Sequence, residues 1–329
     1  LKITVDISLE TGKTGASLTQ LNVALLAEME TVLNAVRPDV SIVHGDTTTA
    51  LSAAMASFYS GTQVAHVEAG LRTNDLLSPF PEEFNRRVIS TVASVNFAPT
   101  ARAQSNLLAE GVSADSICVT GNTVIDSLMW TTEILRQSPQ LGDRIVHDLG
   151  TPEGFSPIHD EFVLVTFHRR ENQGEGIENI CEAILRLSRD FPHLSFLFPV
   201  HLNPRVRGPV TRILSGVRNV FLLRPLGYFE LVFLLAHSLF VMTDSGGLQE
   251  EAPSLGKPVL VLREVTERPE AVSSGSATLV GTSTSTLVAR ASELITNAEL
   301  YERMSHVANP YGDGFASDRI LVRLREKFS

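Results

Sequence analysis

The chain has 329 residues, of which 43% are hydrophobic, and its formal net charge is -10 at pH 7. This length allows a sizeable core, most simply divided between two domains, and the acidic balance argues against nucleic acid or an anionic membrane surface as a partner. The longest apolar run, Leu231–Met242, is interrupted by His237 and is too short to span a bilayer. Two cysteines in apolar settings, Cys118 and Cys181, are typical of a reduced, cytoplasmic protein, and the histidines form no ligand-spaced metal cluster.

Short β-branched segments alternate with helical patterns along the chain, which predicts parallel α/β sheets. In the first half we expect four strands and four helices: Val40–His44, Val64–Glu68, Val95–Ala98 and Ile117–Thr120, with Leu18–Val36, Thr49–Tyr59, Glu82–Ala93 and Ala101–Glu110. In the second half we expect strands at Phe162–Phe167, Ser195–Phe198, Val220–Leu223, Leu239–Thr243 and Val259–Leu262, and helices near Ile177–Asp190, Arg205–Leu214, Tyr228–His237, Gly247–Leu255 and Ser285–Asn297.

These patterns predict two Rossmann-like, doubly wound domains that face a cleft lined by the carboxyl ends of their strands. The segment Ser138–His159 is rich in Pro, Gly and Asp and is the predicted linker. The chain opens at Leu1 without a strand–glycine–helix unit. We therefore expect the first domain to lack its N-terminal βα units.

The second domain contains a predicted strand that stops at Thr243-Asp244-Ser245-Gly246-Gly247, where a helix begins. Bare N–H groups and the positive end of a helix dipole suit a phosphate at this place. An ordinary strand-to-helix turn explains the pattern equally well. Glu250 and Glu251, one turn into the helix, suit sugar hydroxyls.

Carboxylates follow the predicted strands of the first domain. Asp46 comes just after a strand and next to a helix start, so it is either functional or a helix N-cap. Glu68 ends an apolar strand, where a salt bridge to Arg72 is the structural alternative. Glu82 opens a helix beside Glu83, which the helix dipole favours without any chemistry. Three carboxylates at one edge together suit general acid–base catalysis.

Basic residues follow the strands of the second domain. His168 comes after an apolar strand beside Arg169 and Arg170, a setting that suits a phosphate oxygen or leaving group. His201 has a similar place after the next strand, although a buried and satisfied histidine is the favoured interpretation there. Arg268 is placed to reach a diphosphate, or else exchanges surface ion pairs with neighbouring glutamates.

These motifs resemble those of the non-hydrolysing UDP-N-acetylglucosamine 2-epimerases, in order from about Leu18 to the C-terminus. The matching segments are His44–Thr49, His66–Arg72, Ser78–Glu83, Thr120–Thr123, Phe167–Asn172, Pro199–Pro204, Thr243–Gly247, Thr266–Glu270 and Asn309–Gly314. The resemblance implies a glycosyltransferase-B-like fold. Residues 1–145 would be the remainder of the N-terminal domain, 146–310 the UDP-binding domain, and 311–329 a helix that packs back on the first domain.

The resemblance also implies the site. Its catalytic residues would be Asp46, Glu68, Glu82 and His168, and its substrate contacts would be Arg170, His201, Ser245, Gly246, Gly247, Glu251 and Arg268. The implied reaction interconverts UDP-GlcNAc and UDP-ManNAc through a glycal, without a cofactor or metal, in a cytoplasmic homodimer that supplies cell-surface glycan precursors. A glycosyltransferase of the same fold, or a nucleotide-sugar-binding protein without turnover, remains the alternative. Which carboxylate is the base stays open.

Overall fold

The computed structural model describes residues 4–9, 16–151, 154–169 and 172–328. The chain divides into two compact units: unit 1 comprises Leu1–Thr123 and Phe315–Ser329, and unit 2 comprises Val124–Gly314. The division therefore lies before the expected one near residue 145. Its physical reason is that Ile125, Leu128 and Ile145 are buried in the core of unit 2.

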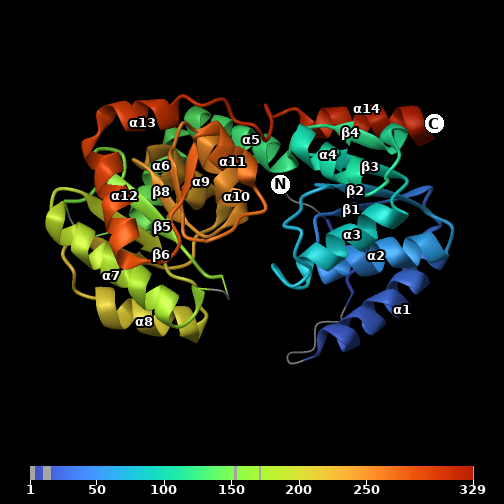
Figure 1. Ribbon diagram of the computed structural model, residues 1–329, viewed down its shortest axis with the longest axis horizontal. Helices are drawn as coiled ribbons and strands as arrows, with labels where there is room; N and C mark the ends of the chain where they lie inside the picture. The colour runs from blue at the N-terminus through green and yellow to red at the C-terminus, as the bar shows by residue number, and fades with distance from the viewer. Residues whose placement is uncertain (1–3, 10–15, 152–153, 170–171, 329) are drawn as a thin grey trace. The chain divides into compact units, whose positions relative to one another are not determined.

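Unit 1 is built on a four-stranded parallel sheet with the strand order β1-β2-β3-β4. Its strands are β1 (Val40–His44), β2 (Gln63–Val67), β3 (Val95–Ala98) and β4 (Ile117–Val119). Its helices are α1 (Leu18–Val36), α2 (Thr48–Tyr59), α3 (Glu82–Val92), α4 (Ala101–Ala109), the 3-10 turn η1 (Ala114–Ser116) and α14 (Ala316–Phe328). Figure 1 shows these elements in blue and cyan, with α14 in red.

Alternate side chains of each strand in unit 1 pack on opposite faces of the sheet, as the period of a strand requires. Val43 and Val64 pack with Ile89 of α3 and with residues of α2. On the other face, Val67 and Phe97 pack with Ile320 of α14. The last helix of the chain is thus part of the core of unit 1.

Unit 2 contains a six-stranded parallel sheet with the order β10-β9-β8-β5-β6-β7. Its strands are β5 (Phe162–Thr166), β6 (Ser195–Pro199), β7 (Val220–Leu223), β8 (Val241–Thr243), β9 (Val259–Val261) and β10 (Ala277–Leu279). Its helices are α5 (Thr123–Gln137), α6 (Pro139–Asp148), α7 (Glu175–Asp190), α8 (Pro204–Leu214), α9 (Tyr228–His237), α10 (Gly246–Ser254), α11 (Pro269–Ser274), α12 (Thr284–Thr296) and α13 (Ala298–Ser305). The chain winds from β5 to β7 on one side and then returns to β8 on the other.

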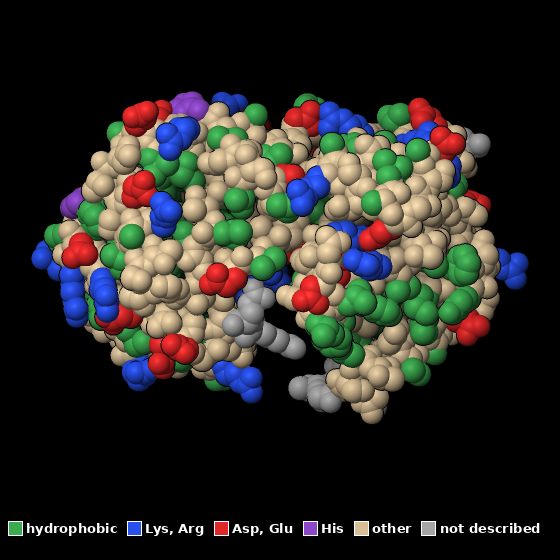
Figure 2. All heavy atoms as spheres, in the orientation of Figure 1, with side chains coloured by type: hydrophobic (Ala, Val, Ile, Leu, Met, Phe, Trp, Pro, Cys, Tyr) green, Lys and Arg blue, Asp and Glu red, His purple; other side chains and the backbone are tan. Residues whose placement is uncertain are grey.

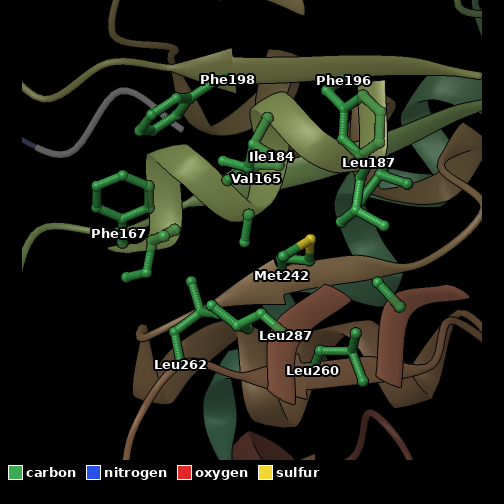
Figure 3. Close-up of a cluster of buried hydrophobic side chains, with 14 of the residues drawn as sticks. Val165, Phe167, Ile184, Leu187, Phe196, Phe198, Met242, Leu260, Leu262 and Leu287 are labelled. Carbon is green, nitrogen blue, oxygen red and sulfur yellow. The ribbon is translucent and has the colours of Figure 1, made fainter. Parts of the chain in front are cut away.

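Helices cover both faces of the unit 2 sheet (Figure 1). Figure 3 shows one face, where Val165, Phe196 and Met242 pack with side chains of α7 and α12. The opposite face carries Phe162, Leu164 and other strand residues that pack with α6, α9 and α10. Because both faces are covered, the strands are apolar throughout, which is why the sequence pattern predicted them.

The predicted strands and helices lie within two residues of the observed ones. The expected linker Ser138–His159 is wrong as a structureless connection, since α6 occupies Pro139–Asp148. Pro139 at the first helical turn is compatible with a helix, and α6 buries Ile145 while Leu149 is buried just after it. The pattern also missed the 15-residue helix α5 and the shorter elements α11, β10 and α13.

Candidate active site

Two strand ends of unit 1 bring Asp46 and Glu68 into one neighbourhood. Gly45 has φ +69, and a Cβ placed there would lie 3.2 Å from Glu68 Oε2. Glu68 itself has a left-handed backbone, with φ 65, which is uncommon for a residue with a side chain. The backbone conformation at β1 and β2 thus sets the Glu68 carboxylate against the chain that leads into Asp46.

Asp46 is held by α3. Its Oδ2 accepts from Arg86 Nη2 at 2.7 Å, and its backbone oxygen accepts from Asn85 Nδ2 at 2.7 Å. The side chain of Asp46 keeps 25% of its surface exposed. The N-cap alternative is wrong, because Thr47 caps α2 by accepting from Ala50 N at 3.1 Å.

Glu68 accepts a hydrogen bond at Oε1 from Asn122 Nδ2 at 3.1 Å. Arg72, the suggested structural partner, instead pairs with Glu110 at 2.7 Å and is almost fully buried. The salt bridge expected between Glu68 and Arg72 is therefore wrong. Asn122 follows β4, so a third strand end of the same sheet orients this carboxylate.

The two acids that open α3 differ in their surroundings. Glu83 is fully buried, accepts from the backbone N–H groups of Thr73 and Asn74, and pairs with Arg86 at 3.2 Å. Glu82 has a buried Oε2 atom with no hydrogen-bond partner in the described part of the chain. Burying a carboxylate oxygen without a hydrogen bond costs free energy, and stability alone does not explain why the fold would bear that cost. Glu83 is thus a structural anchor, and Glu82 remains the candidate for chemistry.

In unit 2, His168 and Asp244 follow β5 and β8, the two neighbouring strands at which the winding of the sheet reverses. Ligands bind at this switch point in open α/β sheets. Asp244 is fully buried and accepts from His168 N at 3.0 Å, Arg169 N at 2.8 Å and Asn172 Nδ2 at 2.9 Å. One carboxylate thus shapes the loop after β5.

The His168 ring lies 3.6 Å from Asp244 through Nδ1 and stacks on His201 with a centroid separation of 5.5 Å. Burial lowers the pKa of His168 below its usual range, with Arg169 and His201 adding to the effect and Asp244 opposing it. The expectation of a buried His201 is wrong, because the residue lies in the exposed loop after β6, where it accepts from Asn203 N at 3.1 Å. Arg170, a predicted substrate contact, lies outside the described residues.

The Ser245–Gly247 segment opens α10 directly after β8. The Ser245 side chain makes no capping hydrogen bond to the helix. A Cβ on Gly246 would come within 2.7 Å of Arg268 Cζ, whereas one on Gly247 would meet Glu251 Oε2 at 3.7 Å. Gly246 is therefore required by the guanidinium packed over it, and the first turn of α10 presents backbone N–H groups suited to an anion.

Arg268 is buried among carboxylates. Its Nε donates to Glu250, and its Nη1 donates to Glu267 at 2.6 Å. Glu267 also pairs with Arg263 at 2.8 Å. The surface ion-pair alternative is wrong, because only 8% of Arg268 is exposed. This buried cluster fixes a positive group beside the start of α10.

Glu251 lies one turn into α10 and accepts from Tyr228 Oη at 2.7 Å. Burial raises the pKa of the Glu251 carboxyl, and the Tyr228 hydroxyl opposes that shift. The sequence missed Tyr228, as it missed Arg86, Asn122 and the structural role of Asp244. Only Asn122 and Asp244 had a signal, since both lie inside the quoted motifs.

The described residues contain no group of His, Cys, Asp or Glu arranged to hold a metal ion. Within 4–9, 16–151, 154–169 and 172–328, no helix has the length and apolar character needed to cross a membrane. Each unit has its own group of candidate residues: strand-end carboxylates in unit 1, and a glycine turn with histidine and arginine in unit 2.

A parallel sheet that reverses its winding beside a glycine turn, together with a second parallel unit bearing strand-end carboxylates, defines an α/β protein of the glycosyltransferase-B-like class. The family model described as UDP-N-acetylglucosamine 2-epimerase matches residues 1–325. The chain belongs to the UDP-N-acetylglucosamine 2-epimerase family.

Individual relatives agree with this assignment. The UDP-N-acetylglucosamine 2-epimerase of Yersinia pestis is 47% identical over 324 residues, which cover 98% of this chain and 85% of the relative. A crystal structure of UDP-GlcNAc 2-epimerase from Neisseria meningitidis bound to UDP-GlcNAc has a TM-score of 0.94 at 44% identity and covers 98% of this chain and 86% of that one. The Methanocaldococcus jannaschii enzyme in complex with UDP-GlcNAc and UDP has a TM-score of 0.84 at 32% identity, with 98% and 85% covered.

Proposed function

We propose that this chain is an isomerase that reversibly interconverts UDP-GlcNAc and UDP-ManNAc by inversion at C2. The observation that carries the proposal is the carboxylate pair of unit 1, Asp46 and Glu68, which adjoin through Gly45 in a chain that a UDP-N-acetylglucosamine 2-epimerase model matches over residues 1–325. The Neisseria meningitidis relative was crystallised with UDP-GlcNAc, which supports the substrate.

The proposed chemistry follows from what C2 inversion demands. A base removes the proton at C2 while the bond between C1 and the UDP oxygen breaks, which gives a glycal and free UDP. UDP then adds back at C1, and a proton is delivered to C2 from the opposite face. These reaction steps involve no net oxidation, so the reaction requires no redox cofactor.

Proton transfer on two faces requires two separate groups, and we assign it to two among Asp46, Glu68 and Glu82. Asp46 is partly exposed, with Oδ2 bound to Arg86 and no hydrogen bond to Oδ1 from the described residues. Glu82 offers its unpaired Oε2. These oxygens are chemically free to exchange a proton with a substrate.

Unit 2 would bind the UDP leaving group. The amides of Ser245, Gly246 and Gly247 and the cation of Arg268 would stabilise charge on the departing diphosphate, and Glu251 would accept from ribose hydroxyls. His168, whose lowered pKa favours the neutral ring at neutral pH, would donate one N–H to a phosphate oxygen. Arg170 and His201 are proposed as further contacts.

Proton NMR of UDP-GlcNAc with this chain in D2O tests the proposal. We expect loss of the C2 proton signal together with growth of UDP-ManNAc deuterated at C2. Retention of the C2 proton in unchanged UDP-GlcNAc would overturn the proposal. Free ManNAc with UDP would identify a hydrolysing enzyme, and product formed only with an added acceptor would identify a glycosyltransferase.

We also propose a cytoplasmic homodimer. Apolar side chains gather on the surface of unit 1 near α1 and α2 (Figure 2), and the exposed apolar residues of these two helices include Val23, Phe58 and Tyr59. Exposed apolar patches of this kind mark association surfaces. Sedimentation velocity should give a dimer for the unsubstituted chain and a shift toward monomer for Phe58→Glu, whereas a monomeric unsubstituted chain would contradict the proposal.

A further inference from the structure

His66 is a fully buried residue of β2 that the proposed chemistry does not use. Its Nε2 lies 2.9 Å from the backbone oxygen of Gly45. A carbonyl oxygen only accepts hydrogen bonds, so Nε2 must carry the proton of this bond. The other ring nitrogen, Nδ1, is buried and has no partner among the residues that the structure describes.

The surroundings of His66 favour the neutral ring. Burial lowers its pKa to about 4, which the hydrogen bond to Gly45 opposes. Among the charged groups that act on it, Arg72 and His44 lower the pKa and Asp46 raises it. The neighbouring residue on β3, Asn96, is uncharged and fully buried, and its side chain also lacks a partner in the described chain. Burial therefore outweighs the partial compensation that Gly45 and Asp46 would give to a buried imidazolium.

Gly45 is held by β2 at both of its peptide groups. Its N–H donates to the backbone oxygen of Val67 at 3.0 Å, and its C=O accepts from His66. That carbonyl belongs to the peptide bond that leads into Asp46. Glu68 follows directly on β2, and its Oε2 lies 3.2 Å from the position that a Cβ on Gly45 would take. The His66 hydrogen bond thus ties the backbone of Asp46 to the strand that carries Glu68.

We infer that His66 is a positioning residue for C2 proton transfer: as a neutral Nε2–H imidazole it fixes the Gly45–Asp46 peptide, and through it the place of the Asp46 carboxylate relative to Glu68. The inference rests on the proposed function of these two carboxylates. His66 exchanges no proton with the substrate. Its contribution is geometric, and a displacement of about 1 Å in a catalytic group can cost about 100-fold in rate.

Three variants test this role through kcat, KM for UDP-GlcNAc and the Kd for UDP. His66→Gln places an amide N–H near the Nε2 position and keeps the bond, whereas His66→Leu fills the space without a donor. Asn96→Leu is the matched control, because it removes a buried polar side chain of the same sheet layer without touching Gly45. We expect kcat to fall about 10- to 100-fold in His66→Leu. In His66→Gln and Asn96→Leu, kcat should stay within about threefold of the unsubstituted chain. The Kd for UDP should stay within about threefold in all three variants.

Equal losses in the Gln and Leu variants, unchanged kcat in His66→Leu, or a parallel loss of UDP affinity would overturn the inference. A second readout does not depend on turnover. In the 15N-histidine-labelled chain, NMR should show His66 as the neutral Nε2–H tautomer from pH 5.5 to 8.5. A titrating or Nδ1–H ring would overturn the inference, whereas absence of C2 exchange in the unsubstituted chain would instead overturn the proposed function.

Discussion

Carboxylates stand at or just after strand ends in both units, yet their surroundings differ. In unit 1, Asp46 remains a quarter exposed and Glu68 is half-buried, and each is oriented by an amide or guanidinium from another segment. In unit 2, Asp244 is fully buried and spends its oxygens on backbone and amide donors. Position at a strand end is therefore not enough to mark a catalytic acid: Asp46 keeps Oδ1 without a hydrogen bond from the described residues, whereas both oxygens of Asp244 accept hydrogen bonds.

The largest effect on stability is expected at Arg86, the cation that pairs with the partly exposed Asp46. Arg86 is buried and joins Asp46 to the fully buried Glu83, so Arg86→Met would leave Glu83 with only its backbone donors and the longer ion pair to Arg87 at 3.4 Å. We expect the free energy of unfolding to fall by about 3–5 kcal/mol in urea titrations. The control Arg136→Met removes a surface pair with Glu133 and should leave it unchanged. Equal losses of unfolding free energy in Arg86→Met and Arg136→Met would show that the ion pairs of Arg86 contribute no more to stability than an exposed ion pair does.

The free energy of unfolding should depend on pH through His66, because this buried residue of unit 1 resists protonation in the folded state. Above the usual pKa of 6.5, the His66 ring is neutral in both the folded and the unfolded chain and adds no pH dependence to the free energy of unfolding. As the pH falls toward the folded pKa of about 4, the unfolded chain binds the proton more readily than the folded one. His66 should therefore cost about 3 kcal/mol of stability by pH 4.

Unfolding free energies measured between pH 7 and 4 should thus fall less steeply in His66→Gln. The exposed His306 provides the control, since His306→Gln should keep the steep slope. Identical slopes for His66→Gln and the unsubstituted chain would contradict the buried, neutral imidazole.

Neighbouring glycines test the packing of unit 2. Gly246→Ala would press a Cβ onto Arg268 and should lower the free energy of unfolding by about 1–3 kcal/mol. Gly247→Ala meets only an ordinary contact with Glu251 and should leave stability unchanged or raise it by up to about 1 kcal/mol. If both variants unfolded at the same urea concentration, Arg268 would not lie over Gly246 in solution.

The smallest effect is expected at Tyr228. Tyr228→Phe removes one hydrogen bond to Glu251, the proposed ribose ligand, and should weaken UDP binding about fivefold by calorimetry. The loss should shrink with 2′-deoxy-UDP if Glu251 contacts that hydroxyl. A loss of the same size with both nucleotides would argue that Tyr228 acts elsewhere.

The sequence predicted the elements well because strands such as β5 and β6 are buried on both faces and therefore apolar throughout. It misplaced the unit boundary because the Pro and Gly content of residues 138–159 outweighed the apolar spacing of Ile145 and Leu149, which bury against unit 2. The sequence could not predict which residues the carboxylates pair with. Arg86 and Asp46, for example, are 40 positions apart, and only the folded sheet brings the two together.

The same limit explains the errors at single residues. Surface ion pairs were the alternative for Arg268, because Glu267 and Glu270 are its neighbours in sequence, whereas Glu250, from another helix, buries it. A buried His201 was the favoured interpretation, but the residue lies in the exposed loop that follows β6. Local pattern therefore located the site, and tertiary packing decided which groups remain available.

C2 proton exchange in D2O, measured for Asp46→Asn and Glu68→Gln together with UDP affinity on the same samples, tests whether the carboxylates of unit 1 carry out the C2 chemistry. We predict exchange slowed about 10²- to 10⁴-fold in each variant, UDP affinity within about threefold of the unsubstituted chain, and unchanged exchange in the surface control Glu30→Gln. Exchange at the unsubstituted rate in both carboxylate variants would contradict the assignment of C2 chemistry to unit 1.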